Sequence, residues 1–148
     1  MLVVGDTVSM LVTSANTHLE QLGGRTVSAF PDKYFSTPLK ETMYSLGINK
    51  TSVGPRIQTT DANGNITVTR NRSVSITLGI NVYAPHSMGG EACAVGFDRW
   101  IDFVVRTLQI NVSDAGCGEV EYDQSRGTNV LKGYFTFERT VSESIPAT

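Results

Sequence analysis

The chain has 148 residues, of which 40% are hydrophobic and 18% charged, and its formal net charge is −2. This length predicts one domain, residues 1–148, whose folding buries roughly 68–70% of the surface of the unfolded chain. The composition excludes wholesale disorder and a fibrous repeat, and the charge argues against a broad basic surface for wrapping nucleic acid.

The two cysteines, Cys93 and Cys117, lie far apart and belong to no CxxC or Cys/His cluster. We therefore expect neither a zinc site nor a disulfide framework, and we predict no other metal or cofactor. The N-terminus, MLVVGDTVSM, lacks the pattern of a secretory signal, and no run of about 18 apolar residues occurs. We expect a soluble protein that is made and assembled in the cytoplasm, with no membrane partner.

The first predicted element is a helix. Asp6 or Thr7 is a suitable cap, and Gly23-Gly24 is a natural stop. One helical face carries the apolar residues Val8, Leu11, Val12, Ala15, Leu19 and Leu22.

Two strands are predicted after this helix. Residues 25–30 alternate as a short strand that Pro31 ends, and residues 34–39 contain a proline and indicate a loop or an irregular edge. Residues 42–48 alternate again and predict the second strand.

The hydrophobic signal weakens between Val53 and Ser73. Gly54-Pro55 and the segment 61–65 supply turn residues, so residues 57–60 and 66–70 are predicted to pair as a polar hairpin. If this hairpin continues the strands on either side, each of its strands reaches roughly 26 Å beyond the core at ~3.3 Å per residue.

A reach of this size exceeds the radius of gyration of about 15 Å that a compact chain of this length has. We therefore expect an arm, about residues 54–72, that contacts another subunit and contributes little to the monomer core. The candidate interface residues are Ile57, Thr59, Asp61, Asn63, Asn65, Thr67, Arg70 and Arg72.

A strand signal changes directly into a helix signal between Ser73 and Val105. Residues 74–82 alternate between apolar and small or polar residues, which is typical of a strand with one buried face. Pro85 ends the strand, and Ser87 to Gly90 form a corner. The helix that follows has an apolar stripe of Cys93, Phe97, Trp100, Ile101 and Val104, which we expect to pack on the sheet.

The C-terminal part predicts a strand over 116–123, a turn over 124–127 and a last strand over 130–138. Residues 141–148 are polar and are expected to form a mobile tail. The order of the elements predicts an α+β fold, a mainly antiparallel sheet with two helices packed on one face and a projecting polar hairpin or loop.

The residues with reactive side chains do not combine into a catalytic motif. His18 and His86 are candidate general bases by residue type, but no signature places a nucleophile with either of them. Asp98 and Asp102 share a helix face with Glu91 nearby, and such carboxylates more often solvate an amphipathic helix than bind a metal.

The glycines before the second helix, in Met88-Gly89-Gly90, could present free amides to a phosphate, yet the phosphate-binding glycine motifs are absent. The tight corner explains them better. The apolar stripe is likewise a core element before it is a ligand pocket. The cluster of Arg70, Asn71 and Arg72 is equally consistent with nucleic-acid contact and with a solvated strand end.

A family resemblance rests on three sequence stretches. The strand ends in NVYAP at 81–85, the helix carries FDR at 97–99, and CGEVEYD follows at 117–123. With the order of the elements, these stretches resemble the tail terminator (tail completion) proteins of long-tailed phages and phage-derived contractile particles. The resemblance extends from about Thr7 to Arg139.

The resemblance implies a structural protein and not an enzyme. Such a protein forms a ring of six subunits that caps the head-proximal end of the tail tube and stops its polymerisation. It joins the tail to the head or caps a headless particle such as a bacteriocin. Its partners are other copies of itself, the tail tube protein, the sheath protein and the head-side connector, and DNA only passes through the ring.

The same resemblance places the protein in the bacterial cytoplasm during assembly and then in the tail of the virion or particle. Two alternatives remain open at this stage. One is another head-to-tail joining protein, and the other is a small α+β enzyme or ligand-binding domain that uses the corner from His86 to Glu91.

Overall fold

The computed structural model describes residues 4–28, 41–124 and 127–142. The helical elements are α1 (Val4–Asn16), α2 (Leu19–Leu22), the 3-10 helix η1 (His86–Met88), α3 (Glu91–Asp102) and the π-helix η2 (Phe103–Thr107). The strands are β1 (Thr26–Ser28), β2 (Met43–Thr60), β3 (Ile66–Pro85), β4 (Val112–Cys117), β5 (Glu121–Asp123) and β6 (Thr128–Ser142).

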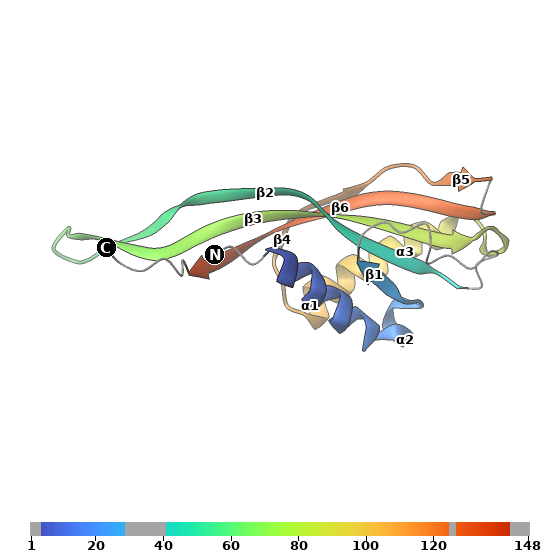
Figure 1. The fold of residues 1–148 in the computed structure, drawn as a ribbon, viewed down its shortest axis with the longest axis horizontal. Coiled ribbons are helices and arrows are strands. Elements are labelled where there is room, and N and C mark those ends of the chain that lie inside the picture. Colours follow the sequence, from blue (N-terminus) through green and yellow to red (C-terminus); the bar gives the residue numbers. More distant parts are fainter. Residues whose placement is uncertain (1–3, 29–40, 125–126, 143–148) are drawn as a thin grey trace.

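These strands form one six-stranded sheet in the order β1-β2-β3-β6-β4, with β5 also paired to β6. Every pair is antiparallel except β1 with β2. The helices lie on one face of the sheet and cover only part of its length (Figure 1). The fold is therefore α+β, as predicted, and the polar hairpin projects from it.

The core lies between this face and the helices. β3 and β6 bury the residues that alternation assigned to one side, and α3 and η2 bury most of the predicted stripe. The buried set from these elements comprises Val74, Ile76, Leu78, Ile80, Val82, Leu131, Phe135, Phe137, Cys93, Phe97, Trp100 and Val104. Ile101 is only partly buried, and Phe103, three residues after Trp100, completes the stripe.

Trp100 lies at the centre of an aromatic cluster. Its ring centroid is 5.5 Å from that of Phe103, 6.2 Å from that of Tyr44 and 6.3 Å from that of Phe135. The partners come from a helix and two strands, so this one side chain links the helical layer to the sheet. The Tyr44 hydroxyl donates to the Leu22 carbonyl, and burial raises the pKa of Tyr44 to about 12.

The predicted first helix is divided into α1 and α2. The backbone departs from helical geometry at His18 (φ −124°, ψ 42°), and the Thr17 hydroxyl donates to the Ser14 carbonyl at 2.7 Å. Side chains that bind nearby carbonyls compete with the helix ladder, which explains the break. The predicted stop is confirmed, because Gly23 adopts φ +74° and its N–H donates to the Leu19 carbonyl.

The strands differ from the predicted bounds in length more than in place. β2 and β3 run without a break into the arm, and β1 begins at Thr26, one residue after the start of the predicted strand, whose last two residues, 29–30, lie outside the described residues. The strand predicted over 116–123 is two strands, β4 and β5, which pair with different parts of β6. β6 continues to Ser142, two residues into the predicted tail. The loop predicted over 34–39 and the tail residues 143–148 lie outside the described residues.

Trp100→Ala is expected to lower the free energy of unfolding by about 3–5 kcal/mol, because it leaves a cavity where helix and sheet meet. Urea denaturation measures this loss. Val95→Ala is the control, because Val95 lies on α3 but is 46% exposed, and it should change the free energy by no more than about 0.5 kcal/mol. A Trp100→Ala protein as stable as the control would show that the stripe does not hold the layers together.

Candidate functional site

The arm is the part of the β2–β3 hairpin that extends past the rest of the sheet (Figure 1). Among the described residues, β3 pairs with β6 as far as Asn71, which lies opposite Ser142, the last residue of β6 that the structure describes. Beyond this pair the described residues of the hairpin form a ribbon of two strands, and every residue from Gln58 to Thr67 is exposed. The arm thus lies outside the layer of helices that buries the core.

The base of the arm is bent and held in place. The Arg72 guanidinium donates through Nη1 to the Gly54 carbonyl at 3.2 Å, and Arg72 pairs with Arg56 across the ladder. The register shifts on both sides of Arg56, and such irregularities bend and twist a ribbon. A Cβ atom at Gly54 would lie 3.0 Å from the Ser73 carbonyl oxygen, so the strands are tightly packed here.

The tip of the arm is a tight turn. The Gly64 N–H donates to the Asp61 carbonyl at 3.1 Å, the Asp61 N–H donates to the Asn65 carbonyl at 3.0 Å, and Gly64 has φ +82°. This geometry is that of a three-residue hairpin loop with a glycine bulge. Sequence reasoning had identified these turn residues correctly.

The Asp61 side chain reinforces the turn. Its Oδ1 accepts from the backbone N–H groups of Asn63 and Asn65, both at 2.9 Å. These two hydrogen bonds hold the pKa of the Asp61 carboxyl below its ordinary value of 3.8, and the bond from Asn65 has the larger effect. The tip is therefore an ordered structure, with its backbone donors directed at one carboxylate.

The structure groups most of the predicted interface residues at or near this tip. Thr59 pairs with Thr67, and Asp61, Asn63 and Asn65 form the turn; all five are exposed. Ile57 and Arg72 are half-buried nearer the base, and the side chain of Arg70 lies outside the described residues.

Sequence reasoning missed Ile66. It pairs with Thr60 next to the turn and is 64% exposed, although it is a large apolar side chain. Its signal was present as a β-branched apolar residue beside a polar turn. A single exposed apolar side chain is common on protein surfaces, so Ile66 is notable only for its place beside the ordered turn of the arm.

The two histidines occupy separate places. His18 lies in the break between α1 and α2, not on the polar face of a continuous helix; its Nδ1 is 2.8 Å from the Ser14 carbonyl and its ring packs on Phe103. His86 is exposed, and its Nδ1 is 3.4 Å from Asn129 Oδ1.

Neither Cys93 nor the helix carboxylates form a reactive set. The Cys93 thiol faces the carbonyls of Val82 (3.5 Å) and Asn129 (3.3 Å), and burial raises its pKa to about 11. It is therefore a protonated thiol at neutral pH, which makes it a poor nucleophile. Asp102 forms an exposed ion pair with Arg106 at 2.8 Å, which is an ordinary contact of a solvated helix face.

The strand-to-helix corner is explained by its backbone. Gly89 adopts φ +85°, a conformation that side chains disfavour, while a Cβ atom at Gly89 or Gly90 would meet no atom within 4 Å. The positive φ therefore explains the glycine at position 89, and close packing does not.

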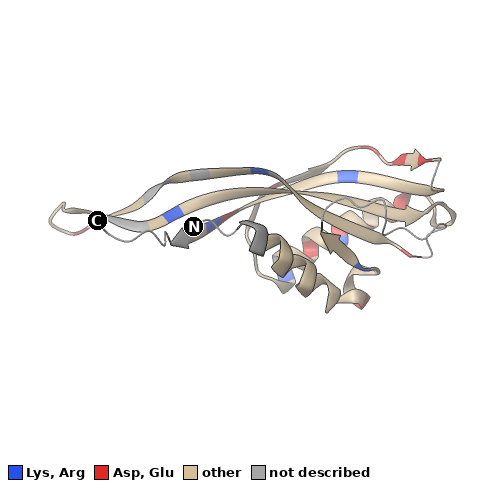
Figure 2. Ribbon diagram, viewed as in Figure 1, with Lys and Arg blue, Asp and Glu red and all other residues tan. Residues whose placement is uncertain are grey.

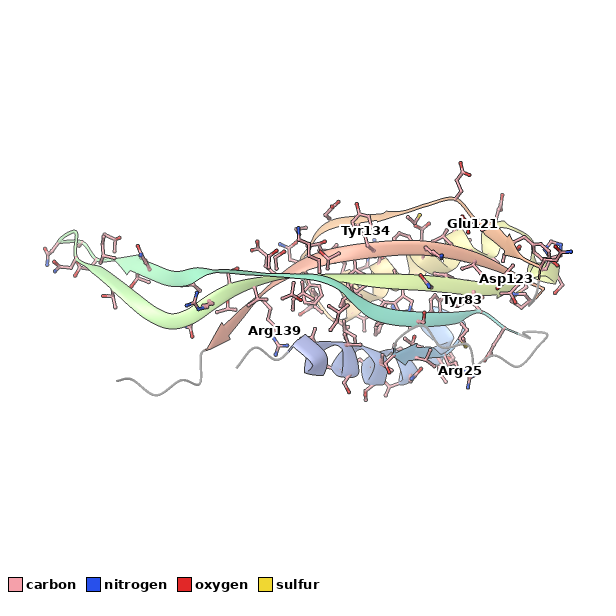
Figure 3. All side chains as sticks on the ribbon, turned by 45° about the horizontal axis from the view of Figure 1, so that its top comes forward. Arg25, Tyr83, Glu121, Asp123, Tyr134 and Arg139 are labelled. Atoms are coloured by element: carbon pink, nitrogen blue, oxygen red, sulfur yellow. The ribbon has the colours of Figure 1, made fainter. Side chains whose placement is uncertain are left out.

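A shallow hollow of about 300 Å³ lies beside β5. It is lined by Tyr83, Glu121, Tyr122, Asp123, Val130 and Lys132, three of which are labelled in Figure 3. Its carboxylates come from one edge strand and make that edge acidic. In the described part of the chain, no three His, Cys, Asp or Glu side chains are placed to hold a metal ion.

The sequence matches no model of a known protein family, and a search of curated proteins finds no match either. None of the helices in the described ranges combines the length and the apolar character needed to cross a membrane.

Asp61→Ala is expected to loosen the tip without affecting the core. Amide exchange of Asn63 and Asn65 should accelerate, because both N–H groups lose their acceptor, while the global unfolding midpoint stays unchanged. In the wild type the pKa of Asp61 is lower in the folded turn than in the unfolded chain. The stabilisation of the turn by the Asp61 carboxylate is therefore complete above pH 3.8 and is lost as the pH falls through the folded-state pKa. Thr59→Ala serves as the exposed control. Equal exchange in Asp61→Ala and wild type would contradict the role of the carboxylate.

Proposed function

We propose that this chain is a structural assembly protein that caps the head-proximal end of a phage or phage-like tail tube as a ring of six subunits. The ring stops polymerisation of the tube and joins the tail to a head, or caps a headless particle. The proposal rests on the resemblance over residues 7–139 and on one structural observation, the exposed two-stranded arm beyond the core.

The arm supports an assembly role because of its energetics. An isolated two-stranded hairpin is marginally stable at best in water. Ordering each residue of such a ribbon costs about 1–2 kcal/mol of conformational entropy, and exposed polar side chains bury little apolar surface to offset it. The ordered turn at Asp61 and the exposed Ile66 make most sense as parts of an interface. A neighbouring subunit or the tube would supply the missing surface.

A ring also explains how such a protein ends a polymer. When each subunit offers two different surfaces to its neighbours, the contacts close into a ring if the rotation between subunits allows it. The ring then has no lateral surface left. One face of the ring would dock on the last tube ring, and the other face would lack the surface that recruits another tube subunit.

Replacement of Ile57–Val68 by a short Gly-Ser turn tests the role of the arm. The thermal unfolding of the monomer should change little, because the residues of this range whose side chains the structure describes, 57–67, do not belong to the core cluster. Ring formation and capping should weaken, and tails of uncontrolled length should appear in electron micrographs.

Two point variants separate arm length from arm surface. Ile66→Thr keeps a β-branched residue and the length of the ribbon but removes the exposed apolar side chain, so it should also weaken capping. Val95→Thr makes a similar exposed change on α3 and should not. Normal tail lengths with the shortened arm would show that the arm is dispensable, and a failure to fold would show that it belongs to the core.

A structural role also predicts that no reactive side chain is essential. His18→Ala, His86→Ala and Asp98→Ala should each retain assembly when the protein folds. Circular dichroism checks folding, and electron microscopy with tube fragments checks assembly. A variant that forms rings but has lost a measurable chemical turnover would contradict the structural role.

A further inference from the structure

The two lateral edges of the sheet differ in charge (Figure 2). On one edge, Lys50 is the one charged residue of β2 whose side chain the structure describes, Arg25 precedes β1, and the acidic Glu41 precedes β2. On the other edge, the charged residues of the stretch 112–123 are all acidic: Asp114, Glu119, Glu121 and Asp123. In Figure 3, Arg25 and Glu121 lie on opposite sides of the sheet.

Two of the charged residues, Lys50 and Asp114, lie in one row of residues that pair with one another across the strands. Lys50 pairs with Thr77, Thr77 pairs with Thr136, and Thr136 pairs with Asp114. The hydroxyls of the two threonines are 2.8 Å apart, so the row has its side chains on one face, the face away from the helices. Lys50 and Asp114 therefore lie at the same level, on the same face and at opposite edges.

A bulge gives Lys50 this orientation. Tyr44, Leu46 and Ile48 alternate toward the helices, and an uninterrupted strand would send residue 50 the same way. The register shifts between Ile48 and Lys50, which leaves Asn49 as an extra residue and turns Lys50 to the row of Thr77.

The strand directions suit pairing between the two edges. β2 and β6 are both antiparallel to β3, and β4 is antiparallel to β6, so β4 runs opposite to β2. A second copy with its β2 beside β4 would continue the antiparallel sheet. In the described part of the chain, β1 covers β2 only at residues 44–46, and no strand covers the outer side of β4.

The lengths agree as well. By the same pairings, the ends of β4, Val112 and Cys117, share rows with Thr51 and Leu46 of β2. These rows include residues 47–51, the part of β2 just past β1. Lys50 and Asp114 are exposed, and neither has an ion-pair partner among the described residues; Asp114 Oδ2 accepts a hydrogen bond from the Tyr134 hydroxyl at 3.3 Å.

We propose that copies of this chain join head to tail through these edges, β4 of one copy beside β2 of the next, with Asp114 opposite Lys50. The partner is a second copy of the chain, and opposite charges set the register. The two edges differ, so the contact is heterologous and suits a closed ring. The inference deepens the proposed function and rests on it for ring closure.

Charge exchange tests this register. Lys50→Glu and Asp114→Lys should each weaken self-association by roughly two- to thirtyfold per interface, because a cross-strand attraction becomes a repulsion. The double variant restores opposite charges and should associate like the wild type. Sedimentation velocity over a concentration series measures this, and the differences should shrink between about 0.05 M and about 1 M salt.

Matched controls make the same changes of net charge away from the edges. Arg106 and Asp98 lie on the exposed side of η2 and α3, so Arg106→Glu and Asp98→Lys should leave association unchanged. Thermal unfolding of each variant confirms that it folds. A double variant no better than the single ones, or a wild-type chain that does not self-associate, would overturn the proposal.

Cysteine cross-linking tests the contact directly. Lys50→Cys with Asp114→Cys, in a Cys117→Ser chain, should give a ladder of disulfide-linked oligomers, because facing residues of paired strands lie within disulfide range. Cys93 is buried and should not react. Assembled particles without a ladder would assign the interface to other surfaces.

These results are separable from the proposed function. A ladder and charge rescue in a protein that does not bind tube ends would overturn the capping role alone. Capped tubes with no effect of charge exchange would overturn the edge contact alone.

Discussion

The hydrogen-bonded ladder around β3 is the constraint on which the rest of the structure depends. β3 is 20 residues long, and where it lies between β2 and β6, over residues 71–83, its N–H and C=O groups need partners on both sides. β2 and β6 must therefore be long as well, at 18 and 15 residues. The helices cover only one stretch of this ladder (Figure 1). The arm is the remainder of the same ladder, which continues after its core has ended.

Burial explains which parts of this fold could be predicted from the sequence. Alternate residues from Val74 to Val82 and the stripe from Cys93 to Val104 face the core, and a buried face imposes a period of two or of three to four on the sequence. The break at His18 and the start of β4 depend on local hydrogen bonds and on an exposed edge, neither of which leaves a hydrophobic period. The alternation that predicts β2 ends at residue 48 for the same reason, and its continuation into the arm was predicted only as one possibility, because the described side chains from Lys50 to Thr60 are exposed or half-buried.

The candidate site divides in the same way. The turn from Asp61 to Asn65 could be predicted because turn residues have a local mechanism, while Ile66 was missed because exposed apolar residues are common and uninformative alone. The row that joins Lys50 to Asp114 was beyond sequence reasoning. It depends on three strand pairings and on the bulge at Asn49, and a slip of one residue would turn Lys50 to the opposite face.

The outer edge of β2 is also limited in a way that favours a defined assembly over a fibre. After Val53 the strand contains Gly54-Pro55 and two register shifts, and Pro55 has no N–H to donate. Irregular edges with proline discourage indiscriminate pairing between sheets. A regular ladder with another copy is thus confined to the few residues between β1 and Gly54, the stretch that contains Lys50. The ribbon beyond can make side-chain contacts only, so in the proposed assembly the same strand would serve the core, the edge contact and the arm in succession.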